Sequence, residues 1–441
     1  MKKIFTLIIL SYLRILARIQ LLKFRPIIIG VGGASGKTSL ANFISLILQE
    51  KYKVLETKGK NSQTGIPLSI LRIKYEEYTF YYWLKVIFVA LYKVIFDWNK
   101  FDFFVAELGI DGPYEPKNMS YLLKIVKPQV GVLTNISFEH SQYFEEVLGK
   151  EKNASEKILE MTADQESLLL KTLPKDGLAV LNIDDFQIRN IKGIKADTLT
   201  VSSKDKTSDF FIEGIKSSIL DFKTNFFYKN NNYSITIKNP LPSHYATSFL
   251  LAIAVSSHFG IAIIESIKIL EDKFSLPHGR LSVFKGIKET TIIDSSYNNA
   301  TLAPILDILD LVKNISGKRR KMAILGDLRE LGIISQNYHK KVAKKILETL
   351  DFAILIGPMM QKYAAPVLEK AKFPFYSFEN FTKARKSILD SVQNRDVILV
   401  KGSQNTLFLE RAVEILLKDK KDASKLCRRG LYWNKKRKET F

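Results

Sequence analysis

The stretch GVGGASGKTS, residues 30–39, is rich in glycine and ends in Lys37, Thr38 and Ser39, whose side-chain types can bind phosphate or a metal ion. It follows the apolar run Ile27–Ile29 and precedes LANFISLILQ, whose apolar residues have helical spacing. A strand, a glycine turn and a helix N-terminus form a cradle whose backbone N–H groups bind phosphate. Lys37 would neutralise the phosphates of a nucleoside triphosphate, and the Thr38 hydroxyl would bind Mg²⁺. The predicted cradle consists of Gly33, Ala34, Ser35, Gly36, Lys37, Thr38 and Ser39.

A carboxylate and an imidazole follow two other strand-like runs. AELGIDGP places Glu107 at the end of one run, and TNISFEH places His140 shortly after Asn135 at the end of another. Functional residues collect at the carboxyl ends of parallel strands, so these side chains are expected beside the phosphate loop. Oxygen and imidazole ligands there predict a metal site. Each residue alone could equally be a cap or a surface residue.

The elements that must position these residues alternate between apolar strand-like runs and helical patterns. This alternation predicts an α/β fold with mostly parallel sheets. Residues 186–240 are more polar and predict antiparallel strands inserted before the helix-like stretch HYATSFLLAIAVSSHFGI. After LPHGRL, residues 276–281, TTIIDSS begins a second series of strands, which places the main boundary near His278. The predicted parts are an amphipathic segment, a central P-loop domain, a Rossmann-like C-terminal domain and a basic tail, at 1–25, 26–278, 279–420 and 421–441.

The composition limits the partners and the compartment. The 441 residues include 67 Lys and Arg but 45 Asp and Glu, so the formal net charge is +22. Such a chain favours a polyanionic neighbour: nucleic acid, anionic lipid or a phosphorylated substrate. The one cysteine, Cys427, excludes an intrachain disulfide and fits a reducing cytosol. The run from Lys418 to Lys438, with Tyr432 and Trp433, is either a solvated tail or a contact for an anionic surface.

The N-terminal stretch, MKKIFTLIILSYLRILARIQLLKFRP, lacks the small-residue cleavage site of a signal peptide. Arg14 and Arg18 interrupt its apolar run well short of the ~18 residues that a membrane span needs. Residues 81–98 have the same character, with Lys85, Lys93 and many aromatic residues. Either segment could pack on its own protein, but the basic chain favours contact with a membrane interface. The first would be a helix with one polar stripe, formed by Ser11, Arg14, Arg18 and Arg25.

The chain resembles the Mur ligases, which join an amino acid or peptide to a carboxylate using ATP, over about residues 26–415. DSSYNNA and GDLRELG look like the branch that adds D-alanyl-D-alanine to UDP-N-acetylmuramoyl-tripeptide. Folylpolyglutamate ligases and other muramyl branches usually carry a histidine where this chain has residues 295–299, without one. The D-alanyl-D-alanine-adding branch also carries an N-terminal domain that binds UDP, where this chain has the amphipathic segment. The anchors, in family order, are GVGGASGKTS, KNSQTGIPLSIL, VAELGIDGP, VGVLTNISFEH, GLAVLNIDD, HGRL, IIDSSYNNA, ILGDLRELG and ILVKGS.

The resemblance implies that a substrate carboxylate takes the γ-phosphate of ATP and that an amine then displaces the phosphate. Two Mg²⁺ ions would assist, one held by Thr38 and Glu107 and the other by His140 and a carbamylated lysine. ASEKIL offers Lys157 in the family's local pattern. Counting back from LPKDG instead places Glu166, which is already anionic, at that position. We favour Lys157 on the local match and keep Glu166 as the alternative.

The resemblance also assigns binding residues by position. Asn135 and Ser248 would lie on the nucleotide side, and Arg280 at the hinge between domains. Asp327, Lys401 and Ser403 would bind the incoming amine. A cytoplasmic monomer, peripheral at the inner face of the membrane, is expected, and nucleic acid is disfavoured because no RNA-binding or helicase-like motif series occurs. A non-catalytic membrane-associated relative and a basic P-loop ATPase are the alternatives. The segment expected to close over the nucleotide contains Asp294, Tyr297 and Asn298.

Overall fold

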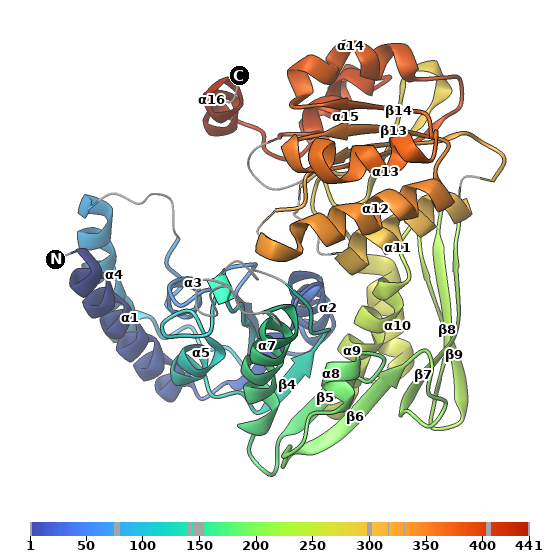
Figure 1. Ribbon diagram of the computed structural model, residues 1–441. Coiled ribbons are helices and arrows are strands. Elements are labelled where there is room, and N and C mark those ends of the chain that lie inside the picture. The colour runs from blue at the N-terminus through green and yellow to red at the C-terminus, as the bar shows by residue number, and fades with distance from the viewer. Residues whose placement is uncertain are drawn as a thin grey trace. The chain divides into compact units, whose positions relative to one another are not determined.

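The computed structural model describes residues 2–74, 80–138, 143–144, 154–297, 302–315, 317–329, 331–402 and 407–439. The chain forms two compact units. The first comprises Met1–Gly214, Thr224–Ile235 and Ala246–Lys273, and the second comprises Ile215–Lys223, Thr236–Tyr245 and Phe274–Phe441. Both are built from helices and largely parallel sheets (Figure 1), which confirms the predicted α/β fold.

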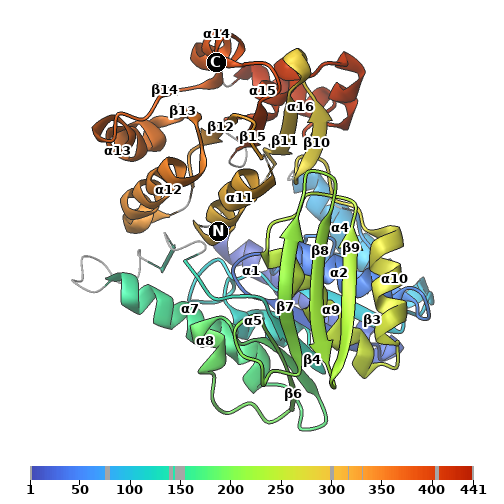
Figure 2. The same ribbon diagram turned by 90° about the vertical axis from the view of Figure 1, so that its right-hand side faces the viewer.

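Within the described residues, the larger sheet has nine strands in the order β2-β3-β1-β4-β5-β6-β7-β8-β9. The strand before the glycine loop, β1, lies parallel between β3 and β4, with Ile29 opposite both Val105 and Val130. Strands β7, β8 and β9 follow one another through short turns and lie side by side (Figure 2). The bounds are β1 Ile27–Gly32, β2 Val54–Glu56, β3 Phe103–Glu107, β4 Val130–Leu133, β5 Leu178–Asn182, β6 Asp197–Ser202, β7 Phe210–Ser217, β8 Phe222–Tyr228 and β9 Asn231–Ile237.

Helices cover this sheet and bury its apolar strands. Phe43 of α2 packs on Phe249 of α9, with ring centroids 4.9 Å apart. Side chains of α1, α5 and α7 share another core cluster with strand residues such as Ile28 and Phe104. The bounds are α1 Lys2–Phe24, α2 Lys37–Leu48, α3 Gly65–Ile70, α4 Phe80–Phe96, α5 Met119–Ile125, α7 Ala154–Lys171, α8 Phe186–Arg189, α9 His244–His258 and α10 Ile263–Lys273.

The N-terminal helix α1 is an integral part of the first unit. It packs on α3, α4 and α5, and one face buries Leu13, Ala17, Leu21 and Phe24. The predicted Arg stripe is divided: Arg14 lies 5.1 Å from the centroid of the Tyr121 ring, whereas Arg18 is exposed. Among the described helices, none has both the length and the apolar content to span a bilayer. One face of α1 therefore packs on its own protein, while the opposite face remains exposed.

The second unit contains a sheet in the order β10-β11-β15-β12-β13-β14. Helices α11, α12 and α13 lie on one face, and α14 and α15 on the other (Figure 1). The strands are β10 Ser282–Lys285, β11 Thr291–Ser295, β12 Lys321–Gly326, β13 Phe352–Ile356, β14 Phe375–Phe378 and β15 Val397–Lys401. The helices are α11 Leu302–Ile315, α12 Ser335–Thr349, α13 Ala365–Lys370, α14 Phe381–Ser391, α15 Glu410–Leu416 and α16 Leu431–Glu439, with short turns η1 Ile287–Glu289, η2 Gly332–Ile334, η3 Met360–Ala364 and η4 Lys420–Lys425.

Candidate active site

The glycine loop between β1 and α2 has a backbone that only glycine adopts easily. Gly33 has φ 110° and Gly36 has φ 83°, both in the left-handed range. A Cβ at Gly33 would lie 2.3 Å from Oγ1 of Thr134, so the next strand end approaches too closely for any side chain. Gly36 caps α2 without a side-chain hydrogen bond, so a bound phosphate could accept from the first N–H groups of the helix.

Asn135, at the end of β4, braces this loop. Its Oδ1 accepts from the Ser35 N–H at 2.9 Å, and its Nδ2 donates to Ser35 Oγ at 2.8 Å. Its backbone oxygen accepts from the Ala34 N–H at 2.8 Å. Asn135 is therefore near the predicted phosphate cradle, and the contacts it makes there fix the shape of the loop.

Lys37 begins α2 and turns back into the loop. Its Nζ donates to the backbone oxygens of Gly33 at 2.6 Å and Ala34 at 2.8 Å, and only 9% of the residue is exposed. The ammonium is therefore fixed within the loop whose N–H groups would hold the phosphates. Ser39, the last residue of the predicted cradle, is half-buried in the first turn of the same helix.

Glu107, at the carboxyl end of β3, reaches the residue after Lys37. Its two carboxylate oxygens accept from Thr38 Oγ1 at 3.0 and 2.9 Å, and Oε1 accepts from Asn61 Nδ2 at 3.1 Å. These donors are neutral, yet Glu107 is only 3% exposed. A buried carboxylate is stable only with a compensating charge or strong hydrogen bonds, so a cation fits here.

The oxygen atoms at this position suit Mg²⁺ in particular. Mg²⁺ is a hard cation that takes one or two carboxylates, with water and substrate phosphates completing the octahedron. In the described part of the chain, no group of three or more His, Cys, Asp or Glu residues converges as a metal cage. The Thr38 hydroxyl and the Glu107 carboxylate beside a phosphate loop therefore fit a nucleotide-bound Mg²⁺.

Of the two candidates for the second anion, the structure brings Glu166 to the loop. Glu166 on α7 is 2% exposed, and its Oε2 accepts from the Gly33 N–H at 2.9 Å. Lys157 lies nine residues earlier on the same helix, about 13 Å along its axis, and is exposed. The structure therefore does not place Lys157 at the loop, contrary to the local sequence match.

The register of α7 has a packing cause. A Cβ at Gly32 would lie 2.7 Å from Oε2 of Glu166, and one at Gly30 would lie 2.8 Å from Cδ1 of Leu169. The two glycines of β1 thus leave the space that Glu166 and Leu169 fill. Sequence comparison near residue 157 alone could not detect this long-range fit.

Two further polar residues surround Glu107 and were not singled out from the sequence. Asn61 lies in the anchor KNSQTGIPLSIL, and the Thr57 hydroxyl accepts from the Glu107 N–H at 3.1 Å. Glu56, the last residue of β2, also faces this region: burial, together with the charge of Glu107, raises the pKa of its carboxyl group. The carboxyl end of the first sheet thus carries one more carboxyl group than the motifs alone indicated.

Ser248 of α9 lies beside the loop as well. A Cβ at Gly36 would be 3.9 Å from Ser248 Oγ, so the helix passes next to the start of α2. Three predicted site residues, His140, Asn298 and Ser403, lie outside the described residues. The first unit therefore assembles Lys37, Thr38, Glu107, Asn135 and Ser248, together with Glu166.

In the second unit, charged side chains gather at the carboxyl ends of β11 and β15. Asp294 is fully buried, and its Oδ1 accepts from the Ser296 N–H at 3.0 Å. Burial, with Arg428 and Arg280 nearby, lowers the pKa of Lys401 to about 7, although Asp294 opposes the shift. Burial also raises the pKa of Asp294. The guanidinium of Arg280 lies 5.4 Å from the centroid of the Tyr297 ring.

Arg428 joins this cluster from a part of the chain expected to be a solvated tail or a surface contact. It is 5% exposed, and its Nη1 donates to Oε2 of Glu410 at 3.0 Å. The same guanidinium donates to the backbone oxygens of Ser296 and Tyr297. The expectation of a wholly solvated tail is therefore wrong for this residue, because Glu410 provides a buried partner that the local charge run does not reveal.

The comparisons with known proteins agree with this geometry. Residues 31–256 match the Mur ligase middle domain, and residues 279–404 match the Mur ligase glutamate ligase domain. The chain belongs to the Mur ligase family. Members of this family are ATP-dependent ligases that form peptide bonds.

Similar Mur ligases are found in several bacteria. The UDP-N-acetylmuramoyl-tripeptide--D-alanyl-D-alanine ligase of Buchnera aphidicola subsp. Baizongia pistaciae is 26% identical over 89% of this chain and 75% of its own length. That of Bacillus subtilis is 25% identical over 92% and 79%. Among solved structures, MurF of Acinetobacter baumannii has a TM-score of 0.74 at 19% identity, covering 93% of this chain and 81% of its own. MurF of Thermotoga maritima, solved with ADP, has the same TM-score at 20% identity, covering 94% and 84%. These structures establish the Mur ligase fold.

Asp327, at the end of β12, has its carboxylate engaged within the Mur ligase C-terminal domain. It accepts from the N–H groups of Met359 at 3.2 Å and Met360 at 2.7 Å, and it is 8% exposed. His339 lies below it, with Nε2 accepting from the Leu328 N–H at 3.1 Å. Burial lowers the pKa of His339. In this structure Asp327 caps a helical turn, which competes with the predicted contact to the amine.

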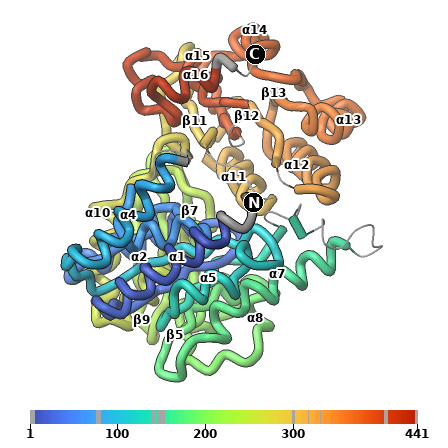
Figure 3. Tube along the Cα trace, turned by 90° about the vertical axis from the view of Figure 1, so that its left-hand side faces the viewer, coloured from blue at the N-terminus to red at the C-terminus, as the bar shows by residue number. Residues whose placement is uncertain are grey.

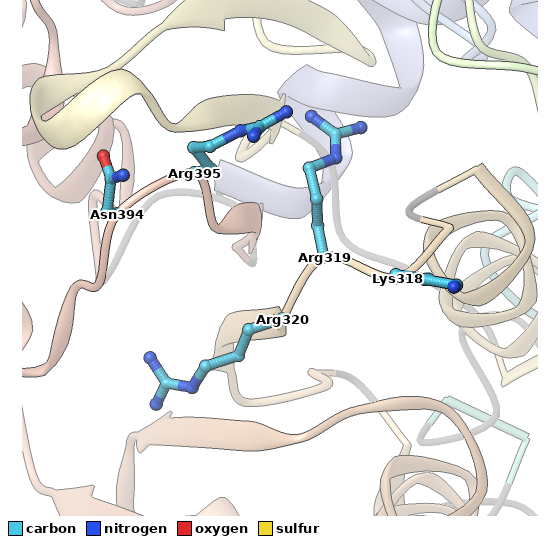
Figure 4. A pocket seen from close by; sticks show the side chains of 5 residues that line it. All are labelled: Lys318, Arg319, Arg320, Asn394 and Arg395. Carbon is cyan, nitrogen blue, oxygen red and sulfur yellow. The ribbon is translucent and has the colours of Figure 1, made fainter.

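A basic pocket of about 540 Å³ lies at the opposite end of the same sheet (Figure 4). Its residues precede β12 and β15, so they stand at the amino ends of strands whose carboxyl ends carry the Asp294 and Lys401 cluster. This separation sets the pocket apart from the Asp294 and Lys401 cluster. The lining side chains are Lys318, Arg319, Arg320, Asn394 and Arg395.

Proposed function

We propose that this Mur ligase uses ATP and Mg²⁺ to join the carboxylate of a cell-wall precursor to an amino acid or dipeptide. The observation that carries the proposal is the contact of Thr38 and Glu107 beside Lys37 in the glycine loop. The dipeptide is favoured because the Buchnera and Bacillus relatives are named as D-alanyl-D-alanine ligases.

The residues divide the chemistry between them. Lys37 and the N-terminus of α2 hold the β- and γ-phosphates, with Ser248 on the nucleotide side and Asn135 bracing the loop. The substrate carboxylate attacks the γ-phosphate, which yields an acyl phosphate and ADP. The amine then attacks the acyl carbon, and inorganic phosphate leaves. Mg²⁺, when bound by Thr38 and Glu107, supplies positive charge that lowers the barrier to phosphoryl transfer.

Glu166 takes the place of the carbamylated lysine in this proposal. Its buried carboxylate already stands at the loop, so no modified side chain is needed to supply the second anion. His140 is the proposed partner of Glu166 at the second ion. Lys157, the residue favoured from the sequence, is exposed and carries no role in this scheme.

The second unit carries the other residues that are proposed to bind nucleotide and amine. Arg280, Asp294, Tyr297 and Asn298 are proposed to close over the nucleotide. Lys401 and Ser403 are proposed to bind the amine substrate, with a smaller part for Asp327 because backbone N–H groups already engage its carboxylate. The burial of Asp294 and Lys401 at adjacent strand ends supports a shared site.

The protein is proposed to act as a cytoplasmic monomer, peripheral at the inner face of the cell membrane. The net charge of +22 supports attraction to an anionic surface. Nucleic acid is not proposed as a partner, because the chain belongs to a ligase family and its phosphate loop has a role without it.

The test is a phosphate-release assay with ATP, Mg²⁺, D-alanyl-D-alanine and a panel of muramyl-peptide carboxylates. We expect release only when both organic substrates are present, together with a product whose mass equals their sum less water. Release that ignores both organic substrates would indicate a P-loop ATPase instead. The absence of any turnover or nucleotide binding would indicate a non-catalytic relative.

A further inference from the structure

Exposed apolar side chains concentrate on two neighbouring helices of the first unit, α1 and α4. Elsewhere in the described residues, large exposed hydrophobic side chains are scattered singly or in small groups. Contiguous apolar surface of this kind marks an interaction site. On these helices and the turn after α4 they are Leu7, Ile8, Ile15, Ile19, Leu22, Tyr81, Leu84, Phe88, Leu91, Tyr92, Ile95, Phe96 and Trp98.

The exposed residues of α4 form one stripe. Tyr81, Leu84, Phe88, Leu91 and Ile95 are spaced by three or four, which places them on one side of a helix. Tyr81 is 82% exposed and Phe88 is 73% exposed. The opposite side buries Val86 and Ala90 against α1 and α3. The stripe is therefore a second apolar face, in addition to the one that the fold uses.

Helix α1 shows the same division. Ile8, Ile15, Ile19 and Leu22 recur at spacings of seven, four and three on its exposed side. Its other side supplies core residues, including Leu13. Both α1 and α4 thus bury one apolar face in their own protein and expose a second apolar face to solvent.

The two helices are held together as one surface. Figures 1 and 3 show α1 and α4 side by side at the outside of the first unit. The Tyr12 hydroxyl donates to the Ile87 oxygen at 3.0 Å, and Lys23 Nζ donates to the oxygens of Val94 and Asp97 at 2.9 Å each. The exposed stripes therefore lie on a fixed platform.

The charge on this platform has one sign. Helices α1 and α4 contain five and two basic residues, respectively, and no acidic residue. Arg18 and Lys85 are exposed among the apolar side chains. Asp97, the residue after α4, is paired with Arg72 at 3.2 Å and with Lys93 at 3.6 Å. A partner must accept apolar rings and also supply negative charge.

We infer that the outer faces of α1 and α4 form a docking surface for an anionic phospholipid bilayer, with both helices lying in the headgroup region. This rests on the proposed peripheral location and assigns it to one face of the first unit. Exposed aromatic rings suit the interface, where one end of the ring is apolar and the other is wet. Basic residues among them attract acidic headgroups. A second copy of the chain fits less well, because two such faces would bring basic residues together without any acid.

The test uses the full-length chain and vesicles of phosphatidylglycerol with phosphatidylcholine, compared with phosphatidylcholine alone. We expect co-sedimentation with the anionic vesicles that weakens at high salt but does not vanish, because salt screens charge and leaves apolar insertion intact. Phe88→Ser with Tyr92→Ser should lower the partition coefficient at least tenfold. Leu220→Ser with Ile264→Ser removes two apolar residues outside this surface that are at least about as exposed, at 77% and 71%, and should leave binding unchanged.

Three outcomes would overturn the inference. One is a wild-type chain that stays in the supernatant with both vesicle types. Another is equal loss of binding in the two double variants. The third is a concentration-dependent dimer, seen by light scattering, that Phe88→Ser with Tyr92→Ser abolishes, since a second copy would then cover the face. Phosphate release in solution separates this test from the proposed function, because the ligase reaction does not require the docking surface.

Discussion

The carboxyl ends of the two sheets both gather buried charge, but they balance it differently. In the first unit, Glu107 accepts from the neutral Thr38 hydroxyl and Asn61 amide. In the second unit, the guanidinium of Arg428 lies against Glu410. Buried charge must be compensated in either case. The first sheet therefore offers ligands for an added cation, whereas the second already has a buried cation, Arg428, which also donates to the backbone oxygens of Ser296 and Tyr297.

The largest expected effect is a loss of stability when the buried ion pair beside the second sheet is broken. Arg428→Met removes the buried partner of Glu410 and should lower the free energy of unfolding by about 3 to 5 kcal/mol, because a buried carboxylate is left without its cation. Urea denaturation measures this. Arg429→Met is the matched control: Arg429 pairs with Glu414 at a more exposed position, and its loss should cost less than about 1 kcal/mol.

A double variant sharpens this result. Arg428→Met with Glu410→Gln removes both charges and should recover part of the lost stability. No recovery would mean that the contacts of Arg428 to Ser296 and Tyr297, rather than the ion pair, carry the effect.

At the first sheet, we expect a substitution to remove ATP turnover while the chain stays folded. Lys37→Ala should slow ATP turnover by more than about 100-fold, roughly 3 kcal/mol in the barrier, since the lysine supplies charge to the transferred phosphate. The loss of the hydrogen bonds to Gly33 and Ala34 should cost only about 1 to 2 kcal/mol of stability, so the chain should remain folded in thermal unfolding. Wild-type turnover in this variant would show that the glycine loop is only a structural turn without a role in ATP turnover.

The pKa of Lys401 gives the second sheet a pH signature. Burial lowers this pKa from 10.5 to about 7 in the folded chain. Above pH 7 the unfolded chain therefore binds more protons at this residue than the folded chain, so its contribution to stability rises with pH. Between pH 7 and 9 the wild type should gain about 2 kcal/mol relative to Lys401→Met. An equal pH slope in both proteins would contradict the buried, titrating amine.

The smallest expected effect follows from removing the Asn135 side chain, which holds the glycine loop in place. Asn135→Ala removes two side-chain hydrogen bonds to Ser35 and should cost about 1 kcal/mol of stability. The KM for ATP should rise severalfold, because the loop would have to be ordered on binding. Asn190→Ala, at an exposed side-chain hydrogen bond in the same unit, provides the control and should change neither quantity.

The local features of the fold could be predicted from the sequence. The buried runs at Ile27–Gly32 and Phe103–Glu107 formed parallel strands because their apolar residues need cover on both faces. The glycine loop and Glu107 followed from where those strands end. These inferences depend only on residues that are close together in the sequence, so they can be made without knowledge of the fold.

Long-range packing explains what the sequence could not provide. Glu166 reaches the loop because Gly30 and Gly32 of β1 leave room for α7, a fit between segments over 130 residues apart. Arg428 is buried because it forms an ion pair with the buried Glu410. The basic run around Arg428 is nevertheless typical of a solvated tail. The amphipathic pattern of α1 likewise indicated an apolar helix without revealing that one face enters the core.

The central claim is that two resident carboxylates, Glu107 and Glu166, serve the metal at the glycine loop without a modified lysine. The most direct test measures Mg²⁺-dependent nucleotide binding and phosphate release in Glu166→Gln and Lys157→Met, each with and without added bicarbonate. We expect Glu166→Gln to lose both functions and Lys157→Met to match the wild type, with no response to bicarbonate. A Lys157→Met variant that fails and is rescued by short-chain carboxylates, beside a Glu166→Gln variant that works, would contradict the account.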